Sequence, residues 1–563
     1  MTRPIDLMRE GRKEELWQMC CGFLDLSLDQ FMSIQKRLLR EQMELLKQCE
    51  LGRRVMGGAM PETVEEFREQ VPLTTYSDYL PDLVEKREEV LPVKPAMWAH
   101  TVGRAGEYII KAVPVSDSSL REFEKVAGGV SLIASCDSRG DFLAKEHVKT
   151  FSPTGSRYYG SGIVGYMAQQ ALGCDLLSSN ANGCSLESAK GSPLEQKIIA
   201  GFQEALYRGL DAIGGLPSVL VHAGEMLTRG AMSVNARFLL SHPKAAFRLA
   251  RALIRSKLAG RAMLPKDLWS VKVALGGGAD SAAFGKRVQE LWGRSPLELY
   301  AGVDGGIYAT QTWDYEGMTF IPNLNFFEFI PEREWFKWQL DHSYRPQTVL
   351  LDELKAGEIY EIVITNLHGG VLTRCRIGDM IRIVSLRNEK LDIDIPQMVF
   401  HGRADDLVDI AGLGRITERI IGEAVENTGI PLVDWVARKE FVDDKPVLHL
   451  YLELADGYIA GEASVAAAAR EQLRRLDRRY RCNFYSLVGN MEATLGLNPL
   501  QVTFLPRGAF AAYAAQRHTE GATLSGLNAP RVNPSDEALS SLTTPKVVVV
   551  AAPATESERL PAQ

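Results

Sequence analysis

The sequence has no long hydrophobic run and no excess of positive charge. No stretch of roughly 18 consecutive apolar residues occurs, and the N-terminus does not show a charged segment followed by an apolar one. The 64 Lys and Arg residues are outnumbered by 71 Asp and Glu, which gives a net charge of −7. The basic run from Arg248 to Arg261 is interpreted as a solvated helix face. We therefore expect a cytoplasmic protein that binds neither nucleic acid nor membrane.

Paired metal-ligand and redox motifs are also lacking. The eight cysteines show no CxxC spacing and have no histidine ligands nearby, so we interpret them as reduced structural thiols. They are Cys20, Cys21, Cys49, Cys136, Cys174, Cys184, Cys375 and Cys482. The sequence contains neither an HxxxH motif, which would indicate a metal site, nor a Gly-x-Ser-x-Gly motif, which would indicate a hydrolase.

The chain has ample material for a large core, because 45% of its 563 residues are hydrophobic and 24% are charged. Apolar residues recur at helical spacing from Leu24 to Cys49 and predict an amphipathic helix, packed on the core or bound to a partner. Segments 216–222 and 270–275 predict buried strands, and segments 193–214 and 243–260 predict helices between strands. This alternation predicts an α/β fold with helices on both faces of a largely parallel sheet.

The texture of the sequence changes near Gly402 and divides the chain into three predicted parts. Residues 1–401 are expected to form a large N-terminal domain. Residues 402–533, which include the predicted strand Val447–Leu454, are expected to form a smaller, mobile domain. Residues 534–563 are rich in Ser, Thr, Pro and Ala, a composition typical of a disordered tail.

One segment places a carboxylate after two strands. Alternating β-branched residues predict a strand at Ile359–Ile364, the stretch Asn366–Gly370 predicts a turn, and Val371–Ile377 predicts a second strand that ends at Asp379. A carboxylate at a strand end can accept hydrogen bonds from both hydroxyl groups of a ribose, and its charge strengthens them. A simple Asp turn is the alternative interpretation.

A glycine-containing loop is a candidate for phosphate binding. Gly103 and Gly106 allow a phosphate to approach the backbone closely, while Thr101 and Arg104 can contact phosphate oxygens. Lys111 follows on the next predicted strand and adds a positive charge. In isolation this motif is equally consistent with a plain glycine turn.

Six sequence blocks, found in the same order, resemble the auxin-responsive Gretchen Hagen family of acyl acid amido synthetases, within the adenylate-forming superfamily. The likeness is closest to the bacterial branch and extends over residues 23–534. The resemblance implies a large N-terminal adenylate-forming domain of layered sheets and helices and a smaller, mobile α+β C-terminal domain. The six blocks are Val71–Tyr79, Trp98–Tyr108, Tyr300–Gly306, Phe326–Pro331, Arg374–Asp379 and Gly402–Asp406.

The resemblance also implies a reaction and a set of nucleotide-binding residues. With ATP and Mg²⁺, a carboxylic acid would become an acyl adenylate, which an amine such as an amino acid then attacks. Asp379 and Arg376 match positions of the ribose-binding segment, and Tyr300 would stack on the adenine. Gly277 would lie beside the adenine and the acyl pocket, and Asp304 would hold Mg²⁺.

The same resemblance assigns catalytic roles to two cations. Lys111 would act at the phosphates, and Arg403 lies in a segment that resembles the hinge of the C-terminal domain. Near the C-terminus, Asn528 stands where the family commonly has a Lys, and Arg531 is the nearest cation that could replace it.

Four further positions depart from the family pattern. Val102 and Ala105 replace hydroxyl residues of the phosphate loop, Val303 replaces a Thr, and Asp304 replaces a Glu. These changes leave two alternatives open beside the amido synthetase. One is a catalytically degenerate relative that binds a nucleotide or an acyl ligand, and the other is an enzyme that transfers the acyl group to a thiol.

Overall fold

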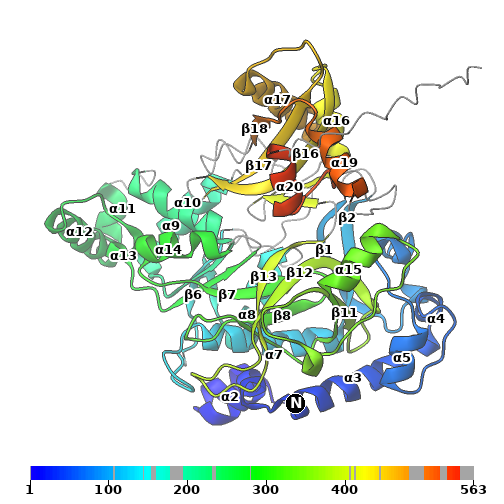
Figure 1. Cartoon of the computed structure of the whole chain (residues 1–563). Helices are drawn as coiled ribbons and strands as arrows, with labels where there is room; N and C mark the ends of the chain where they lie inside the picture. The colour runs from blue at the N-terminus through cyan, green and yellow to red at the C-terminus, as the bar shows by residue number, and fades with distance from the viewer. Residues whose placement is uncertain are drawn as a thin grey trace, which may run out of the picture.

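The computed structural model describes the chain except for several short segments and the C-terminal end. The residues outside this description are 1, 105–107, 144, 154–159, 178–193, 231–235, 279–280, 405–406, 411–413, 443–444, 481–499, 520–528 and 545–563. Figure 1 shows one large sheet with helices packed on it, and a smaller group of C-terminal strands and helices above it. None of the described helices is long and apolar enough to cross a membrane.

Within the described residues, eleven strands form the large sheet, in the order β10-β11-β12-β13-β9-β8-β7-β6-β5-β3-β4. From β4 through β3, β5 and β6 to β7, neighbouring strands are parallel. From β7 through β8, β9, β13, β12 and β11 to β10, neighbouring strands are antiparallel. The bounds are β3 Lys149–Phe151, β4 Asp175–Leu177, β5 Ala212–Gly215, β6 Val273–Gly277, β7 Leu297–Gly302, β8 Gly306–Thr310, β9 Met318–Phe320, β10 Asn325–Pro331, β11 Ile359–Asn366, β12 Cys375–Ser385 and β13 Gln397–Arg403. The prediction of a largely parallel sheet is therefore wrong, because six of the ten pairings among the described residues are antiparallel. Short connections, such as the one between β7 and β8, allow only antiparallel pairing of the two strands that they join.

The helices precede, cover and connect these strands. A long helix predicted near the N-terminus is present as α3, and its polar N-terminus is capped by Ser27. The bounds of the helices are α1 Pro4–Arg9, α2 Lys13–Cys21, α3 Leu28–Gln48, α4 Glu50–Val55, α5 Val64–Gln70, α6 Asp82–Glu85, α7 Asp117–Ile133, α8 Gly160–Leu172, α9 Leu194–Arg208, α10 Pro217–Thr228, α11 Ala236–Ser241, α12 Pro243–Leu258, α13 Pro265–Leu268, α14 Ser281–Trp292, α15 Glu332–Leu340, α16 Glu418–Glu426, α17 Glu462–Tyr480, α19 Ala509–Thr519 and α20 Asp536–Thr543.

Successive residues of the parallel strands face two different hydrophobic cores. Ala212 and Val273 pack in the core that contains α7 and α8, whereas Ile213 and Ala274 pack in a second core with α9, α10 and α14. This alternation is what a strand with side chains on both faces produces. Helices therefore cover both faces of the parallel half, which confirms the predicted α/β class.

The remaining strands form two hairpins and a small C-terminal sheet. They are β1 Pro95–Arg104 and β2 Tyr108–Ser116, β14 Leu407–Ile410 and β15 Gly414–Thr417, and the sheet of β16 Leu432–Val442, β17 Lys445–Leu454 and β18 Leu500–Phe504. The predicted strand Val447–Leu454 is confirmed as part of β17. Val219 at the start of α10 is fully buried in the same hydrophobic cluster as Val408 and Ile410. The domain boundary at residue 402 stays a prediction.

Two predicted elements on the parallel side are wrong. Segment 216–222 is the start of helix α10 and not a strand, because Pro217 occupies the first helical turn, where its missing N–H costs nothing. A short apolar run alone does not distinguish a buried helix from a strand. The helix predicted to reach residue 214 ends at Arg208, where Gly209 adopts a φ of +97°, and the chain then forms β5.

The strand predicted to end at Asp379 starts later and runs past it. β12 begins at Cys375, so Asp379 lies within the strand, paired with Arg403 of β13. The preceding residues do not continue the ladder with β11: Asn366 still donates from its backbone N–H to the Leu372 carbonyl at 2.8 Å, but other groups hold the backbone of Thr373 and Arg374. The N–H of Thr373 donates to Tyr79 Oη at 2.7 Å, and the N–H of Thr74 donates to the Arg374 carbonyl at 2.9 Å. The predicted strand at Ile359–Ile364 and the turn at His368 and Gly369, both with positive φ, are confirmed.

Arg374 holds three distant segments together immediately before β12. Its side chain is 6% exposed, and its Nε and Nη2 donate to the two oxygens of Glu328 on β10 at 2.9 and 2.8 Å. Nη1 donates to the carbonyls of Arg68 and Val71 at 2.5 and 2.6 Å, and Nη2 also contacts Thr348 Oγ1 at 3.3 Å. These contacts use all five N–H donors of the guanidinium.

Replacing Arg374 by Met is expected to lower the free energy of unfolding by about 3–5 kcal/mol, because Glu328 would remain buried with Arg68, whose Nε lies 3.6 Å from Oε1, as its remaining counter-ion. The measurement is urea-induced unfolding followed by tryptophan fluorescence. The double variant Arg374→Met with Glu328→Leu is expected to recover much of the loss, since no charge is then left unpaired. A double variant as unstable as the single one would contradict this account.

Candidate active site

The carboxylate of Asp379 is held by side chains from two other strands. Arg403 on β13 donates through Nη1 to Asp379 Oδ1 at 2.5 Å, and Tyr300 on β7 donates through its hydroxyl to Oδ2 at 2.6 Å. Strand β9 pairs with β13 at only two positions. The ring of Tyr300 also packs against the ring of Phe400 on β13, with ring centres 6.2 Å apart. The predicted residues Tyr300, Asp379 and Arg403 therefore meet, although 103 residues separate the first from the last in numbering.

Burial keeps the two tyrosines of this group protonated. Burial raises the pKa of Tyr300 well above its ordinary value, and the charge of Asp379 adds to the effect. The pKa of Tyr308 is raised likewise by burial and then by the charges of Asp304 and Asp379, so its ring lies in the field of both carboxylates. Within the described residues, the buried Tyr308 hydroxyl has no hydrogen-bond partner. It is a group that a bound molecule or water would satisfy.

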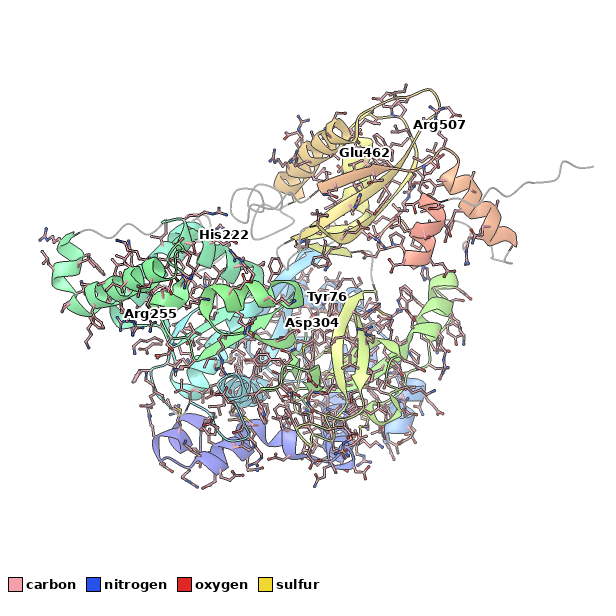
Figure 2. The ribbon with its side chains drawn as sticks, turned by 60° about the vertical axis from the view of Figure 1, so that its left-hand side comes forward. Tyr76, His222, Arg255, Asp304, Glu462 and Arg507 are labelled. Atoms are coloured by element: carbon pink, nitrogen blue, oxygen red, sulfur yellow. The ribbon has the colours of Figure 1, made fainter. Side chains whose placement is uncertain are left out.

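A second cluster surrounds the turn between β7 and β8. Lys111 on β2 pairs through Nζ with Asp304 Oδ1 at 2.6 Å, and the same ammonium lies 4.8 Å from the centre of the Tyr76 ring. Figure 2 shows Tyr76 and Asp304 close together below the C-terminal elements. The side chains of Lys111 and Asp304 are only 14% and 15% exposed, so this ion pair is largely shielded from water.

Two amides fix the backbone of this turn. Asn366 Nδ2 donates to the Asp304 carbonyl at 2.8 Å, and Asn325 Nδ2 donates to the Gly305 carbonyl at 2.7 Å. A Cβ at position 305 would lie 2.5 Å from Asn325 Oδ1 and 2.6 Å from the Tyr308 ring, so only glycine fits. The turn therefore presents Asp304 from a rigid support on the edge of β7 and β8.

The donor set at Asp304 fits Mg²⁺ only if substrate oxygens complete the coordination. No cluster of three or more His, Cys, Asp or Glu side chains that could hold a metal occurs among the described residues. Mg²⁺ in nucleotide sites commonly keeps several waters and takes one or two carboxylates plus phosphate oxygens. Asp304 can supply one such carboxylate, provided that Lys111 releases it.

Arg376 does not join Asp379, although it lies only three residues away. Its guanidinium makes a bidentate ion pair with Glu361 at 2.9 and 2.7 Å and lies 3.8 Å from the ring centre of Trp338. Successive side chains of a strand point to opposite faces, so two residues three positions apart are not expected to share a face. The structure thus places Arg376 on the side of β11 and α15, and a nucleotide contact by Arg376 remains a prediction.

The predicted phosphate loop lies at the tip of the β1–β2 hairpin. Thr101 pairs with Lys111 and Arg104 pairs with Tyr108, so both strands that flank the loop are present. Gly103 is part of β1, whereas Gly106 lies outside the described residues. The substituted residue Asn528 also lies outside them. Arg531 pairs with Asp434 at 3.1 Å, so its charge already has a partner on the C-terminal sheet.

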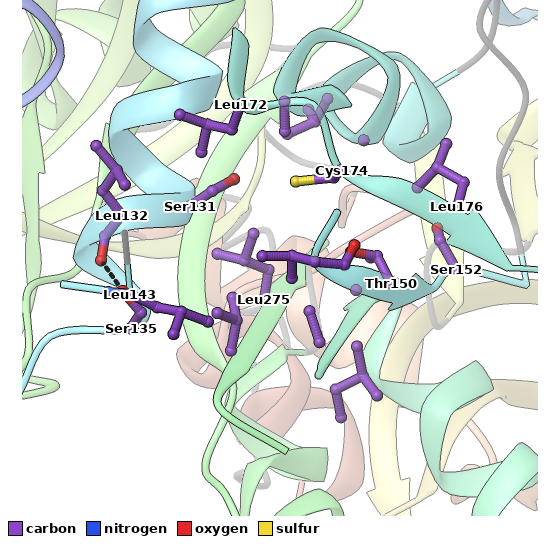
Figure 3. Close-up of a pocket in the computed structure, with 18 of the residues that line it drawn as sticks. Ser131, Leu132, Ser135, Leu143, Thr150, Ser152, Leu172, Cys174, Leu176 and Leu275 are labelled. Carbon is purple, nitrogen blue, oxygen red and sulfur yellow. Dashed lines mark hydrogen bonds between the residues drawn. The ribbon is translucent and has the colours of Figure 1, made fainter. Parts of the chain in front are cut away.

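A largely apolar cavity lies between the parallel strands and the helices α7 and α8 (Figure 3). Its volume for the centres of water-sized spheres is about 90 Å³, several times the roughly 10–15 Å³ that one water requires on this measure. Of the lining residues in the described chain, Lys145 alone is charged, and it pairs with Asp211 at 3.4 Å. Burial raises the pKa of Cys174 to about 12, so this lining thiol remains neutral.

The cavity and the Asp379 cluster both use residues of β7. Leu299 lines the cavity, and its neighbour Tyr300 reaches Asp379. Gly277 also lines it at the end of β6, where a Cβ would lie 3.3 Å from the Leu299 carbonyl. Gly277 therefore lies on the wall of this cavity, and a role of Gly277 beside an acyl pocket stays a prediction.

Family comparison covers both clusters. The GH3 family N-terminal domain matches residues 21–210, which include Lys111, and the GH3 family central domain matches residues 318–403, which include Asp379 and Arg403. The chain belongs to the GH3 family. The bacterial branch within this GH3 family stays a prediction.

Characterised plant enzymes of the GH3 family resemble part of the chain. A jasmonoyl-L-amino acid synthetase, JAR4 of Nicotiana attenuata, is 29% identical over 40% of this chain and 37% of its own length. A 4-substituted benzoates-glutamate ligase, GH3.12 of Arabidopsis thaliana, is 26% identical over 40% of this chain and 38% of its own length. The matched region thus covers less than two fifths of the length of each of these curated relatives.

A solved structure supports the fold of this GH3 family member. The 2-hydroxyisobutyryl-CoA ligase in complex with 2-HIB-AMP and CoA superposes with a TM-score of 0.53 at 14% identity, covering 85% of this chain and 87% of that chain. At this identity the likeness concerns the fold alone, which is that of the adenylate-forming enzymes.

Sequence reasoning missed several residues of the site. Tyr76 and Phe400 contact Lys111 and Tyr300, but neither belongs to a motif with a recognisable chemical role. Tyr308 lies two residues after the predicted block Tyr300–Gly306. The glycine turn between two short strands brings Tyr308 next to the residue that pairs with Tyr300, and this hairpin pattern could have identified it. Glu361 was seen only as part of a strand, although a Glu within an apolar strand needs a partner.

Glu298 supplies a pH-dependent test of the strand that carries Tyr300. Burial raises the pKa of Glu298 from its ordinary value of 4.5 to about 7. The unfolded chain ionises this group first, so stability falls as the pH rises from the ordinary value through about 7. The Glu298→Gln variant, which cannot ionise, is expected to unfold at a higher urea concentration than the wild type at about pH 8 and at a similar one at about pH 4.

The exposed residue Glu389 provides the matched control, because Glu389→Gln removes a carboxylate that is not buried. Urea unfolding midpoints of the three proteins across this pH range make the measurement. A gap between Glu298→Gln and the wild type that is constant with pH would show that Glu298 does not titrate in this window.

Proposed function

We propose that the protein uses ATP and Mg²⁺ to convert a carboxylic acid into an acyl adenylate and then transfers the acyl group to an amine, in particular an amino acid, and not to a thiol. The observation that supports this most is the Asp379 carboxylate held by Tyr300 and Arg403 inside the matched central domain. We also propose a cytoplasmic location, and a C-terminal part that begins near residue 402 and moves about Arg403.

Asp379 is suited to bind both ribose hydroxyls. Its two oxygens accept hydrogen bonds from Arg403 and from Tyr300, and an ionised carboxylate offers about four lone-pair sites in all. The neighbouring guanidinium favours the ionised carboxylate, which accepts hydroxyl hydrogen bonds more strongly than a neutral group. The ring of Tyr300 then lies beside the ribose, where it can also contact the base.

Lys111 and Asp304 have complementary tasks at the phosphates. In the absence of nucleotide they neutralise each other at 2.6 Å. When ATP binds, Lys111 turns to a phosphate oxygen and Asp304 becomes free to hold Mg²⁺, which would supply positive charge to the phosphates. The short distance between the two groups makes this exchange a local movement of side chains.

The proposed chemistry has two balanced steps. A carboxylate oxygen of the acid attacks the α-phosphorus of ATP, the bond from that phosphorus to the bridging oxygen breaks, and pyrophosphate leaves. The amine nitrogen then attacks the acyl carbon, AMP leaves with the electrons of the broken C–O bond, and the nitrogen loses a proton. Lys111 opposes the charge that develops on the phosphates in the first step.

The cavity below β6 and β7 is the proposed site for the acyl part. Its walls are apolar or neutral, apart from Lys145, whose charge is paired with Asp211. A second carboxylate on the substrate would find no free cation there among the described lining residues. We therefore propose a monocarboxylic acid with an apolar body as the substrate class.

The test is ATP–pyrophosphate exchange with Mg²⁺ across a panel of aryl and fatty acids. Asp379→Ala is expected to lower exchange at least about a hundredfold, because hydrogen bonds to a charged group contribute about 1.5–3 kcal/mol each. Asp352→Ala, which removes an exposed carboxylate within the same domain, is the control and should leave exchange unchanged.

The same experiment separates the alternatives. Exchange followed by an amide product supports the proposed acceptor, whereas a thioester with coenzyme A would show a thiol acceptor. Measurable ATP binding without exchange would favour a catalytically degenerate relative, in which the Lys111–Asp304 pair never opens. That reading gains support from the replaced residues Val102 and Val303 on the phosphate side.

The acyl cavity can be narrowed at one glycine. A Cβ at Gly165 on α8 would meet no atom within 4 Å, so Gly165→Leu is tolerated by the fold and fills the cavity. The KM for the largest accepted acid is expected to rise at least about tenfold, with less effect on the smallest. Gly285→Leu on α14, where a Cβ also meets nothing within 4 Å, is the matched control. Equal effects on large and small acids would place the acyl part elsewhere.

A further inference from the structure

The longest acid-free segment of the chain surrounds α12. Residues 226–266 contain nine Lys and Arg and no Asp or Glu, in a chain whose net charge is −7. Two of these cations serve the fold, since Arg248 donates to the carbonyls of Leu206 and Tyr207 and Arg261 pairs with Asp267. Arg229 pairs with Glu225 at 3.4 Å, and the remaining cations leave segment 226–266 with a positive charge, opposite in sign to that of the whole chain.

Helix α12 carries a second apolar face in addition to the one that it buries. Its inner face packs through Ala245, Ala252 and Ser256, which repeat at intervals of seven and four residues. On the opposite face, the same intervals separate Phe247, Ile254 and Leu258. These side chains are 69%, 59% and 85% exposed, and Leu240 on the preceding helix α11 is 86% exposed.

Cations flank this exposed row on both sides. Lys244, Arg251 and Arg255 follow one edge of the helix, and Lys257 lies on the other edge. All four are exposed, and no carboxylate of the described residues pairs with them. The interpretation of this run as a merely solvated face is therefore incomplete, because the outermost residues of α12 are apolar.

The row forms the outer end of a protruding lobe. Figure 1 shows α11 and α12 at one extreme of the molecule, and Figure 2 labels Arg255 on the same lobe. A second copy of this chain would bring two cationic helices together, which is unfavourable. A protruding ridge with an apolar crest and cationic flanks matches an anionic lipid interface, in which a helix lies parallel to the surface with its apolar side among the acyl chains.

We propose that this lobe docks on an anionic membrane surface. Phe247, Ile254 and Leu258 enter the interface, and Arg251 and Arg255 contact the phosphate or carboxylate groups of the lipids. The docking is peripheral and reversible, because one short helix buries little apolar area. Docking requires neither the nucleotide site nor the acyl cavity, so a test of docking does not depend on the proposed activity.

The test is co-sedimentation of the full chain with vesicles. Vesicles of equal parts phosphatidylcholine and phosphatidylglycerol are expected to bind the protein, vesicles of phosphatidylcholine alone to bind it much less, and binding to fall as salt rises. Arg251→Gln and Arg255→Gln should each weaken the partition coefficient about fivefold. Phe247→Ser combined with Ile254→Ser should weaken it at least about tenfold.

Controls remove the same kinds of side chain elsewhere. Ile459→Ser and Lys94→Gln change exposed residues outside the lobe and should leave binding unchanged. Thermal unfolding midpoints check that every variant is folded. Equal binding to both kinds of vesicle, or binding that the lobe variants do not reduce, would overturn the proposal.

Two other outcomes would replace the membrane by a different partner. A dimer in light scattering that Phe247→Ser dissociates, with no vesicle binding, would assign the row to a second copy of the chain. Binding of polyglutamate without binding of anionic vesicles would assign the lobe to an acidic protein.

Discussion

The buried guanidinium of Arg374 is the contact on which the candidate site depends. It joins Glu328 of β10 to the backbone around Arg68 and Val71, and it does so five residues before Asp379. A charge inside the protein is tolerated only with a full set of partners, and this one has them. Because the start of β12 is fixed in this way, the direction in which β12 presents Asp379 is fixed as well.

The charges of the site are neutralised in pairs before any ligand arrives. Arg403 pairs with Asp379, and Lys111 pairs with Asp304. In each pair one group is suited to contact a nucleotide, and the other neutralises its charge until the nucleotide binds. The two ion pairs of this largely buried site are therefore each neutral overall. This arrangement limits the cost of burying ionised groups in the unliganded protein, and a ligand that separates a pair must provide the missing charges itself.

Much of the site could be predicted from the sequence, because each of its motifs places chemically related residues within a short stretch of the chain. Asp379, Tyr300 and Arg403 were each singled out from short blocks, and the structure brings them together. What the sequence did not reveal depends on distant contacts. Arg376 is three residues from Asp379 but pairs with Glu361 of β11, a partner that the sequence of β12 alone does not reveal.

For the fold as well, features that depend on nearby residues were predicted, and features that depend on distant contacts were not. Long amphipathic helices such as α3 and strands such as β11 were predicted from periodicity. The first turns of α10 were mistaken for a strand, because a run of apolar residues is needed in both structures when both faces are buried. The delayed start of β12 followed from hydrogen bonds to Thr74 and Tyr79, which lie some 300 residues away in the sequence.

Helix α10 joins two cores through neighbouring residues. Val219 packs in the cluster of the C-terminal elements, whereas Leu220, the next residue, packs in the core between α9, α14 and the large sheet. Any rotation of the C-terminal elements must therefore expose Val219 or carry α10 along, and exposing one buried Val costs about 1.5–3 kcal/mol. Val219, together with the partly buried Leu216 that packs against the same cluster, therefore opposes a rotation that leaves the sheet core unchanged.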